Sequence, residues 1–471
     1  MGVRFVLNGR VVDAPGADSA PHLSTLNWLR SQGLCGSKEG CAEGECGACA
    51  VALLSTAPGE SGSHFEAVNS CLLPVAALAG RELVTVEGVA AADGNLHPVQ
   101  AAMVAAGGSQ CGYCTPGFVV SLFCEYYRPG RTDFDPESIS GNLCRCTGYR
   151  PIADVARGLP APAAADPRLV QLRTAAPRVS ALEEGSETRF FRPESLRALW
   201  DLYDRYPSAM PIAGGTDLMV YANQRFERWP QLVSLEALPE LAQLSITEQE
   251  LILGAGVPLA RIEHALADTD ARLLAQLWPL FSSRLIRHRA TLGGNLGTAS
   301  PIGDSAPALL ALGAELELVS RSGVRRLALA DFFTGYRKTA LAPGELIQSV
   351  HLRRPLPQFQ RFYKVSKRVL DDISTVAGAF ALSLDSAGNV ARLGIAFGGV
   401  AATPLLASPL EQLALGRPWD EGTLALLLTA SEQLGTPQSD LRGSGAYRRA
   451  MIGKLLEKFF YESQARTEAA E

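Results

Sequence analysis

The chain has 471 residues, of which 47% are hydrophobic and 19% are charged, and its formal net charge is −5. This composition is typical of a globular protein with about three domains, and the small negative charge argues against a general nucleic-acid partner. No apolar run approaches the roughly 18 residues of a membrane span, and the first residues lack the apolar stretch of a secretion signal. With ten cysteines and no export signal, we expect reduced thiols and a cytoplasmic location.

The first patterned segment predicts a β-hairpin and a short helix. Residues 3–7 and 11–14 are strand-like, and the Asn8-Gly9 pair between them is the strongest two-residue hairpin signal. Ser24 is placed to cap the helix that follows. A small mixed α/β domain therefore occupies the start of the chain.

Helical periodicity replaces the strand pattern in the next segment. One apolar face there consists of Phe118, Val119, Leu122 and Phe123. Asp135 followed by Pro136 is typical of a helix start, because proline is tolerated at the first helical position. This segment predicts a compact helical domain.

The rest of the chain predicts a linker and two mixed domains. An Ala- and Pro-rich stretch without periodicity indicates the linker. Residues 377–384 and 390–397 predict a hairpin, and helices are expected from Glu421 onwards. The expected divisions are, in chain order, 1–89, 90–157, the linker 158–188, 189–356 and 357–471.

Eight of the ten cysteines fall into two groups of four. The first group has the C-x4-C-x2-C…C spacing of plant-type ferredoxins, which hold a 2Fe–2S cluster with four thiolates. The second group combines C-x2-C with C-x-C and also supplies four thiolates. The proposed ligands are Cys41, Cys46, Cys49 and Cys71 in the first group, and Cys111, Cys114, Cys144 and Cys146 in the second.

Other uses of these cysteines are open from spacing alone. Four cysteines could also bind zinc, and the C-x2-C of the second group could be a redox dithiol. The glycine-rich first loop favours iron–sulfur, because glycine lets amide N–H groups turn toward inorganic sulfide. We expect the two remaining cysteines, Cys35 and Cys124, to be buried apolar residues. The six scattered histidines argue against a Rieske centre.

Two glycine-rich stretches lie in the third region, at residues 212–218 and 291–304. Neither contains the G-x-G-x-x-G or Walker A pattern. Either stretch alone is explained by a tight turn. Two such stretches downstream of two cysteine groups favour a flavin dinucleotide, whose diphosphate could approach glycines that lack a Cβ atom.

The order of these motifs resembles the molybdenum hydroxylase family over nearly the whole chain. The segments Cys144-Arg-Cys-Thr-Gly-Tyr-Arg150 and Phe332-Phe-Thr-Gly-Tyr-Arg-Lys338 carry the most specific likeness. The resemblance implies an α+β multidomain fold: a β-grasp ferredoxin domain, a four-helix 2Fe–2S domain, an FAD domain of the vanillyl-alcohol-oxidase type and a small α+β C-terminal domain.

The resemblance also assigns cofactor contacts. Phe281 would pack on the isoalloxazine ring, and Gln110 would face the pterin of a partner subunit. Tyr336 and Asp371 are candidates for the NAD⁺ site, the latter because the loop from Lys364 to Ile373 is similar to the family's acceptor-controlling loop. The residues assigned to FAD are Ile212, Ala213, Gly214, Gly215, Thr216, Asp217, Leu218, Phe281, Gly293, Gly294, Asn295, Thr298, Ser300, Asp304, Ile347 and Lys364.

The implied function is electron transfer within a larger enzyme. Electrons from a molybdenum cofactor in a separate, larger subunit would pass through two 2Fe–2S clusters to FAD and then to NAD⁺. By the same resemblance, this chain ends where the molybdenum half of fused relatives would begin. Having both modules on one chain favours the family members that oxidise purines over those that act on carbon monoxide, aldehydes or nicotinate. A non-catalytic redox adaptor is the alternative from another class. Relatives imply a heterotetramer of two heterodimers.

Overall fold

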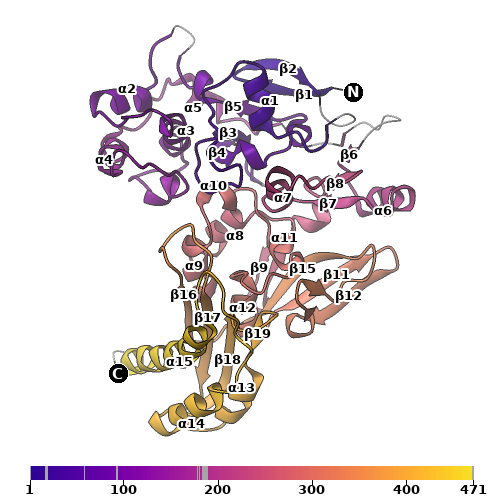
Figure 1. Cartoon of the computed structure of the whole chain (residues 1–471), viewed down its shortest axis with the longest axis vertical. Coiled ribbons are helices and arrows are strands. Elements are labelled where there is room, and N and C mark those ends of the chain that lie inside the picture. Colours follow the sequence, from indigo (N-terminus) through magenta and orange to yellow (C-terminus); the bar gives the residue numbers. More distant parts are fainter. Residues whose placement is uncertain are drawn as a thin grey trace. The chain divides into compact units, whose positions relative to one another are not determined.

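The structure is a computed structural model that describes residues 2–15, 20–57, 59–91, 94–177, 179, 181–182 and 189–468 (Figure 1). The chain forms two compact units. Unit 1 contains Met1–Pro239 and Ser282–Ala290, and unit 2 contains Glu240–Phe281 and Thr291–Glu471. Within the described ranges, no helix is both long and apolar enough to cross a bilayer.

Unit 1 begins with a five-stranded β-grasp sheet. Its order is β2-β1-β5-β3-β4, with β1 and β5 parallel and the other pairs antiparallel. The predicted hairpin is confirmed, since Asn8 and Gly9 both have positive φ, at 50° and 77°. Ser24 caps α1 as predicted, accepting the Asn27 N–H. The elements are β1 Val3–Leu7, β2 Arg10–Ala14, α1 Thr25–Ser31, β3 Ala50–Ser55, β4 His64–Asn69 and β5 Glu82–Val84.

A helical domain follows the β-grasp sheet. The predicted apolar face on α3 is confirmed, because all four of its side chains are buried. Asp135 accepts the Glu137 N–H, but the segment that it caps is only a four-residue 3-10 turn. The helices are α2 Pro98–Ala105, α3 Thr115–Tyr126 and α4 Arg150–Gly158, with the turn at Pro136–Ile139.

The two domains pack backbone against backbone at three glycines. A Cβ atom on Gly117 of α3 would lie 2.2 Å from the Gly47 carbonyl oxygen, and one on Gly47 would lie 2.2 Å from the Gly141 carbonyl oxygen. Any side chain here would force the domains apart. The glycines therefore set how closely the two cysteine-bearing domains approach.

The stretch that we interpreted as a linker packs on the β-grasp domain at its start. It contains α5, Pro167–Gln171, followed by the buried Leu172. The Leu172 carbonyl accepts the Ser63 N–H at 2.8 Å, and the Gln171 amide donates to Glu82 at 2.8 Å. This part of the stretch is a packed connection.

Unit 1 ends with a small parallel sheet of order β6-β8-β7. Glycine-rich residues 213–217 connect β7 to α7 within it. The elements are β6 Phe190–Phe191, α6 Leu196–Arg205, β7 Met210–Ile212, α7 Leu218–Gln224 and β8 Leu232–Ser234, and α10 Arg284–Arg287 also belongs to this unit.

Unit 2 contains two larger antiparallel sheets. One has the order β12-β11-β15-β10-β9 and the other the order β16-β17-β18-β19, and β13 pairs with β14 in a separate hairpin. The strands are β9 Leu244–Ile246, β10 Glu250–Gly254, β11 Glu315–Ser320, β12 Gly323–Ala328, β13 Phe333–Gly335, β14 Lys338–Thr339, β15 Leu346–Arg353, β16 Phe359–Val365, β17 Val376–Leu384, β18 Val390–Gly398 and β19 Leu405–Leu406.

The predicted C-terminal hairpin and helices are confirmed in unit 2. The turn between β17 and β18 is closed by Asp385, whose carboxylate accepts the N–H groups of Ala387 and Asn389. α15 lies against the sheet that contains β16 and β17 (Figure 1). Its Phe459 ring stacks on Phe380 of β17, with the ring centres 5.0 Å apart. The helices are α8 Leu259–Leu266, α9 Arg272–Leu277, α11 Leu292–Gly297, α12 Ser305–Ala311, α13 Ser408–Ala414, α14 Glu421–Ser431 and α15 Gly445–Glu468.

We predict that Gly117→Ala lowers the stability of unit 1, although alanine is normally the better helix former. The added methyl would overlap the Gly47 carbonyl oxygen, and overpacking of this kind costs about 1–3 kcal/mol. Gly158→Ala, at the end of α4 with open space around its Cβ position, should stabilise by roughly 0.5–1 kcal/mol. Melting temperatures from circular dichroism compare the two, and a rise for Gly117→Ala would contradict the packing argument.

Candidate redox site

The first cysteine group lies on a loop and a turn beside the β-grasp sheet. Cys41, Cys46 and Cys49 lie between α1 and β3, and Cys71 lies in the 3-10 turn after β4. The loop bends through residues with positive φ, and a Cβ atom on Gly40 would lie 2.7 Å from the Cys46 Sγ. A side chain at Gly40 would therefore crowd the Cys46 sulfur.

The four thiols of this group shift one another's pKa values in two pairs. The hydrogen bond with Cys46 lowers the pKa of Cys41 to about 5 and raises the pKa of Cys46. Cys49 and Cys71 form the second pair, with the pKa of Cys49 lowered by its bond with Cys71. In the described part of the chain, no three His, Cys, Asp or Glu side chains meet at a single-ion position. Two pairs fit a 2Fe–2S cluster, in which each iron takes two protein ligands.

The second group shows the same pairing at a more exposed place. Cys114 is the residue before α3, and Cys144 lies on the loop before α4. Cys111 pairs with Cys146, both exposed, and Cys114 pairs with Cys144. Burial would raise the pKa of Cys144, but hydrogen bonds from Thr147 outweigh it and bring that pKa to about 7. The donor set again suits two irons, at a surface that another protein can reach.

A main-chain hydrogen bond joins the two cysteine loops. The N–H of Leu143, the residue before Cys144, donates to the carbonyl of Cys46 at 3.0 Å. The Asn142 side chain donates to the Gly47 carbonyl at 3.2 Å and is itself held by the Ser121 hydroxyl. One ligand loop is thus fixed against the other within unit 1.

Two side chains that the sequence did not suggest bind the first loop from α7. Asn223 donates to the carbonyls of Ala42 and Cys71, both at 2.9 Å. Gln224 donates to the carbonyl of Cys41 at 2.7 Å. In the sequence, Asn223 and Gln224 are marked only by their place at the end of the helix that follows the Gly-Gly-Thr-Asp turn. That place does not indicate hydrogen bonds to Ala42 and Cys41, about 180 residues away.

The first glycine pair of the predicted FAD site is needed by the protein's own backbone. A Cβ atom on Gly214 would lie 1.8 Å from the Arg289 carbonyl oxygen, and Gly215 has φ of 82° with a Cβ position 2.8 Å from the Leu72 carbonyl oxygen. The protein's own packing therefore accounts for the absence of a side chain at these two glycines. That residues 212–218 line FAD stays a prediction.

The second glycine-rich stretch lies in unit 2 and is more open. Thr291 caps α11, accepting the Gly294 N–H at 3.1 Å. Gly293 packs against Ala255, whereas a Cβ atom on Gly294 would meet only the Thr291 hydroxyl, at 3.0 Å. Ser305 donates to the Asn295 side chain. The neighbouring predicted residues Thr298 and Ser300 follow on the same segment, and each forms a local hydrogen bond.

Two predicted flavin residues form a buried ion pair in unit 2, and a third follows a residue that this pair contacts. The Lys364 ammonium lies 3.0 Å from the Asp304 carboxylate, and both side chains are buried. Lys364 also donates to the carbonyl of Leu280, the residue before Phe281, at 2.7 Å. The Ser374 hydroxyl donates to Asp304. Asp304 thus holds both ends of the loop that contains Asp371.

The remaining predicted residues have different surroundings. Gln110 is exposed beside Cys111, and Ile347 is buried in β15. Tyr336 is 62% exposed in the hairpin of β13 and β14, with the Arg337 guanidinium 6.0 Å from its ring centre. Asp371 has φ of 50°, and its carbonyl accepts a hydrogen bond from Arg368.

The two cysteines outside the groups differ from each other. Cys124 is buried in α3, as expected. Cys35 is exposed, so our expectation of burial was wrong there. It follows the turn at Gly33, which has φ of 82°, and no strand or helix carries it into the core.

Three protein families match successive parts of the chain. Residues 85–157 match the 2Fe-2S binding domain, residues 186–355 the FAD binding domain in molybdopterin dehydrogenase, and residues 361–463 the CO dehydrogenase flavoprotein C-terminal domain. These matches confirm the predicted multidomain fold and the presence of iron–sulfur and FAD-binding domains.

Similar proteins extend these matches. The chain is 32% identical to xanthine dehydrogenase of Drosophila pseudoobscura pseudoobscura over 97% of its own length, and it spans 39% of that relative. CO dehydrogenase from Oligotropha carboxidovorans has a solved chain that is 27% identical with a TM-score of 0.53, covering 59% of this chain and 97% of that one. A solved chain of quinoline 2-oxidoreductase from Pseudomonas putida 86 is 26% identical with a TM-score of 0.52, and the match covers 57% of this chain and 94% of that one.

Cysteine substitutions separate cluster ligands from other cysteines. We predict about four iron atoms in the purified chain, two per cluster. Cys71→Ala and Cys111→Ala should each remove one cluster and one of two EPR signals of the reduced protein. Cys124→Ala, buried like Cys71, and Cys35→Ala, exposed like Cys111, should keep both. Stoichiometric zinc, or unchanged iron in the first two variants, would contradict the assignment.

Glycine substitutions test the FAD segment in unit 2. We predict that Gly294→Ala keeps its circular dichroism spectrum but binds FAD at least about tenfold more weakly, a loss of ~1.4 kcal/mol, because Gly294 is a predicted FAD contact and the added methyl would meet only the Thr291 hydroxyl of the protein itself. Gly297→Ala, with open space at its Cβ position, is the control and should keep FAD. Gly214→Ala should instead impair folding. Full flavin occupancy in Gly294→Ala would place the diphosphate elsewhere.

Proposed function

Because this chain belongs to the molybdenum hydroxylases, as the part with the iron–sulfur and FAD-binding domains, we propose that it is the electron-transfer component of a xanthine dehydrogenase. The observation that carries the proposal is the extent of similarity. A xanthine dehydrogenase aligns over 97% of the chain, whereas the solved CO dehydrogenase and quinoline oxidoreductase chains cover 57–59% of it. The alignment with the first kind of enzyme extends over both the cysteine groups and the flavin domains of this chain.

The residues of this chain would hold and position the cofactors. The paired thiols of the two groups are the proposed cluster ligands, and the Leu143 to Cys46 hydrogen bond fixes one ligand loop against the other. Asn223 and Gln224 hold the first loop in shape. When bound, the clusters carry single electrons and FAD passes an electron pair to NAD⁺ as hydride.

The buried Lys364 and Asp304 pair has a role in this proposal. A cation near the flavin would stabilise a negatively charged reduced ring. The Asp304 carboxylate compensates the buried charge of Lys364. Without such a partner, burial of a charged ammonium group is strongly unfavourable. Phe281, next to the Leu280 carbonyl that Lys364 binds, is proposed to pack on the ring.

A larger partner subunit would carry the molybdenum cofactor and dock at the second cysteine group. The exposure of Gln110, Cys111 and Cys146 supports this surface. Tyr113 and Leu143 are large side chains that are also exposed there, and an exposed apolar patch is typical of a protein interface. Two such heterodimers would form a heterotetramer, and the cytoplasm is the proposed location.

A carbon monoxide or related hydroxylase is the second candidate. Its support is the match of residues 361–463 to the CO dehydrogenase flavoprotein C-terminal domain and the similar solved chain. The substrate is set by the molybdenum-bearing partner, so identifying the chain that co-purifies and assaying xanthine, aldehydes, nicotinate and carbon monoxide with the complex distinguishes the two.

The isolated chain provides the direct test. We expect anaerobic NADH to bleach its flavin and to support reduction of an artificial dye, because the flavin site lies in this chain. Xanthine should produce no turnover until the partner is added. Turnover of xanthine by the chain alone would overturn the two-subunit proposal, and a flavin that NADH does not reduce would indicate the non-catalytic adaptor.

Tyr336 tests the acceptor site. In the complex, Tyr336→Ala should lower kcat/KM for NAD⁺ by about tenfold, or ~1.4 kcal/mol, because the ring offers an apolar face and a polar tip to the nicotinamide. Xanthine-to-dye activity should be retained. Tyr461→Ala, an equally solvent-facing tyrosine on α15, is the matched control. Unchanged NAD⁺ kinetics in Tyr336→Ala would place the nicotinamide elsewhere.

A further inference from the structure

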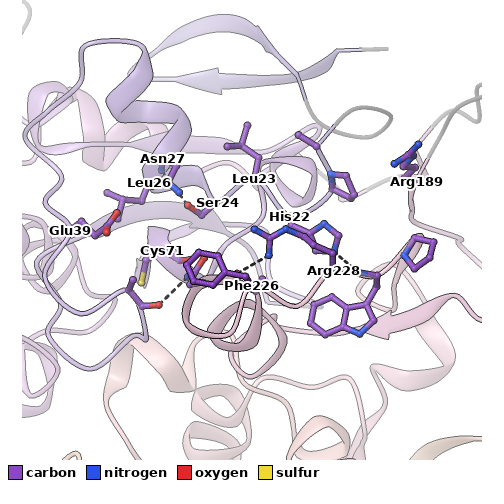
Figure 2. Close-up of a pocket in the computed structure, with 17 residues that line it drawn as sticks. His22, Leu23, Ser24, Leu26, Asn27, Glu39, Cys71, Arg189, Phe226 and Arg228 are labelled. Atoms are coloured by element: carbon purple, nitrogen blue, oxygen red, sulfur yellow. Dashed lines mark hydrogen bonds between the residues drawn. The ribbon is translucent and has the colours of Figure 1, made fainter.

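A pocket of about 880 Å³ in unit 1 lies outside the predicted FAD and NAD⁺ sites (Figure 2). Much of its lining comes from residues 20–27 of the β-grasp domain and residues 226–230 after α7. Its wall also includes Cys71 of the first cysteine group and Ala42, the neighbour of Cys41. Its volume is within the range of small-molecule sites, which is about 300–1,000 Å³. The pocket is therefore large enough for a compact organic ligand.

Aromatic side chains border this pocket, and one of them, Phe226, has a strained backbone conformation. His22 packs on Trp229 with ring centres 5.6 Å apart. Phe226 is 76% exposed and has φ of 57°. A bulky residue with positive φ is a backbone outlier, and such strain gathers at functional sites. An exposed, strained phenylalanine at a pocket is accounted for if a ligand covers its ring.

The polar lining is rich in donors and carries more positive than negative charge. The Nε2 atom of His22 accepts the Trp229 N–H at 3.0 Å. Burial and the nearby Arg228 lower the pKa of His22, so its neutral ring carries a proton on Nδ1. The lining contains two guanidinium groups, of Arg189 and Arg228, and one carboxylate, that of Glu39. Arg228 also donates to the carbonyls of Ala222 and Glu227, both at 2.7 Å. This charge balance favours an anion.

We propose that this pocket binds a planar aromatic monoanion, such as an aromatic carboxylate. The ring would pack against Phe226 and Trp229, and the carboxylate would interact with the arginines, whose planar donors match its two oxygens. A neutral aromatic molecule would leave the excess positive charge of the lining without a counter-charge, and an inorganic anion would leave the Phe226 ring in water.

Binding of the ligand would also affect the hydrogen bonds of the first cysteine loop. Asn223 lines the pocket and holds the carbonyls of Ala42 and Cys71. A ligand that shifts this amide changes the hydrogen bonding of the loop around the proposed cluster. This second element rests on the proposed function, whereas the binding itself does not.

Isothermal titration calorimetry of the purified holo-chain tests binding with 2-naphthoate and its neutral analogue 2-naphthamide. We expect the carboxylate to bind at least tenfold more tightly. Arg189→Gln should lower that affinity about tenfold. Phe226→Gly should do the same while the melting temperature stays equal or rises, because glycine adopts positive φ without strain. Arg157→Gln on α4 and Tyr461→Ala on α15, which are exposed and outside the pocket, should bind like the wild type.

Equal affinity for the amide, or unchanged affinity in Phe226→Gly, would overturn the site. EPR of the reduced holo-chain tests the coupling: 2-naphthoate should shift only the signal that Cys71→Ala removes. Calorimetric binding without that shift would overturn the coupling. If the chain held no iron, the proposed function would fail while the calorimetric result stood, so the two failures are distinguishable.

Discussion

Direct contact between two main-chain segments is the constraint on which the redox half of this protein depends. Gly117 and Gly47 have no side chain where α3 crosses the first cysteine loop, and the Leu143 N–H reaches the Cys46 carbonyl only because that crossing is so close. Backbone contacts of this kind tolerate little adjustment, since packed interiors have no spare volume. The spacing of the two cysteine-bearing loops is therefore set by contact between their backbones.

The FAD-binding family match is divided between the two compact units. Residues 186–239 of this match belong to unit 1 with the cysteine domains. Buried ion pairs link this segment to the β-grasp domain. Arg81 of the β-grasp domain lies 3.2 Å from Glu236, which also pairs with Arg289. Burial would raise the pKa of Glu236, but the two arginines outweigh it and hold that pKa below its usual range. Removing one member would leave a buried charge uncompensated, which is strongly destabilising.

The two cysteine groups differ in solvent access, and this difference agrees with their proposed places in an electron path. Cys49 and Cys71 are buried, and α7 side chains cover the loop around them. Cys111 and Cys146 are exposed. A buried cluster suits transfer inside the chain, and an exposed one suits transfer across a protein interface. The pocket beside Cys71 adds a place where a small molecule could influence the buried group.

Short-range patterns in the sequence determined a good part of this picture. The Asn8-Gly9 hairpin, the Ser24 cap, the strands at 377–384 and 390–397 and the cysteine spacings each depend on residues close together in the sequence, so local chemistry specifies them. The pairing of thiols, the hydrogen bonds from Asn223, the exposure of Cys35 and the contact of Gly214 with Arg289 were decided only by the tertiary structure. Each of these depends on contacts between segments that are far apart in the sequence, or on whether the folded core covers a side chain. Local sequence patterns do not specify such contacts.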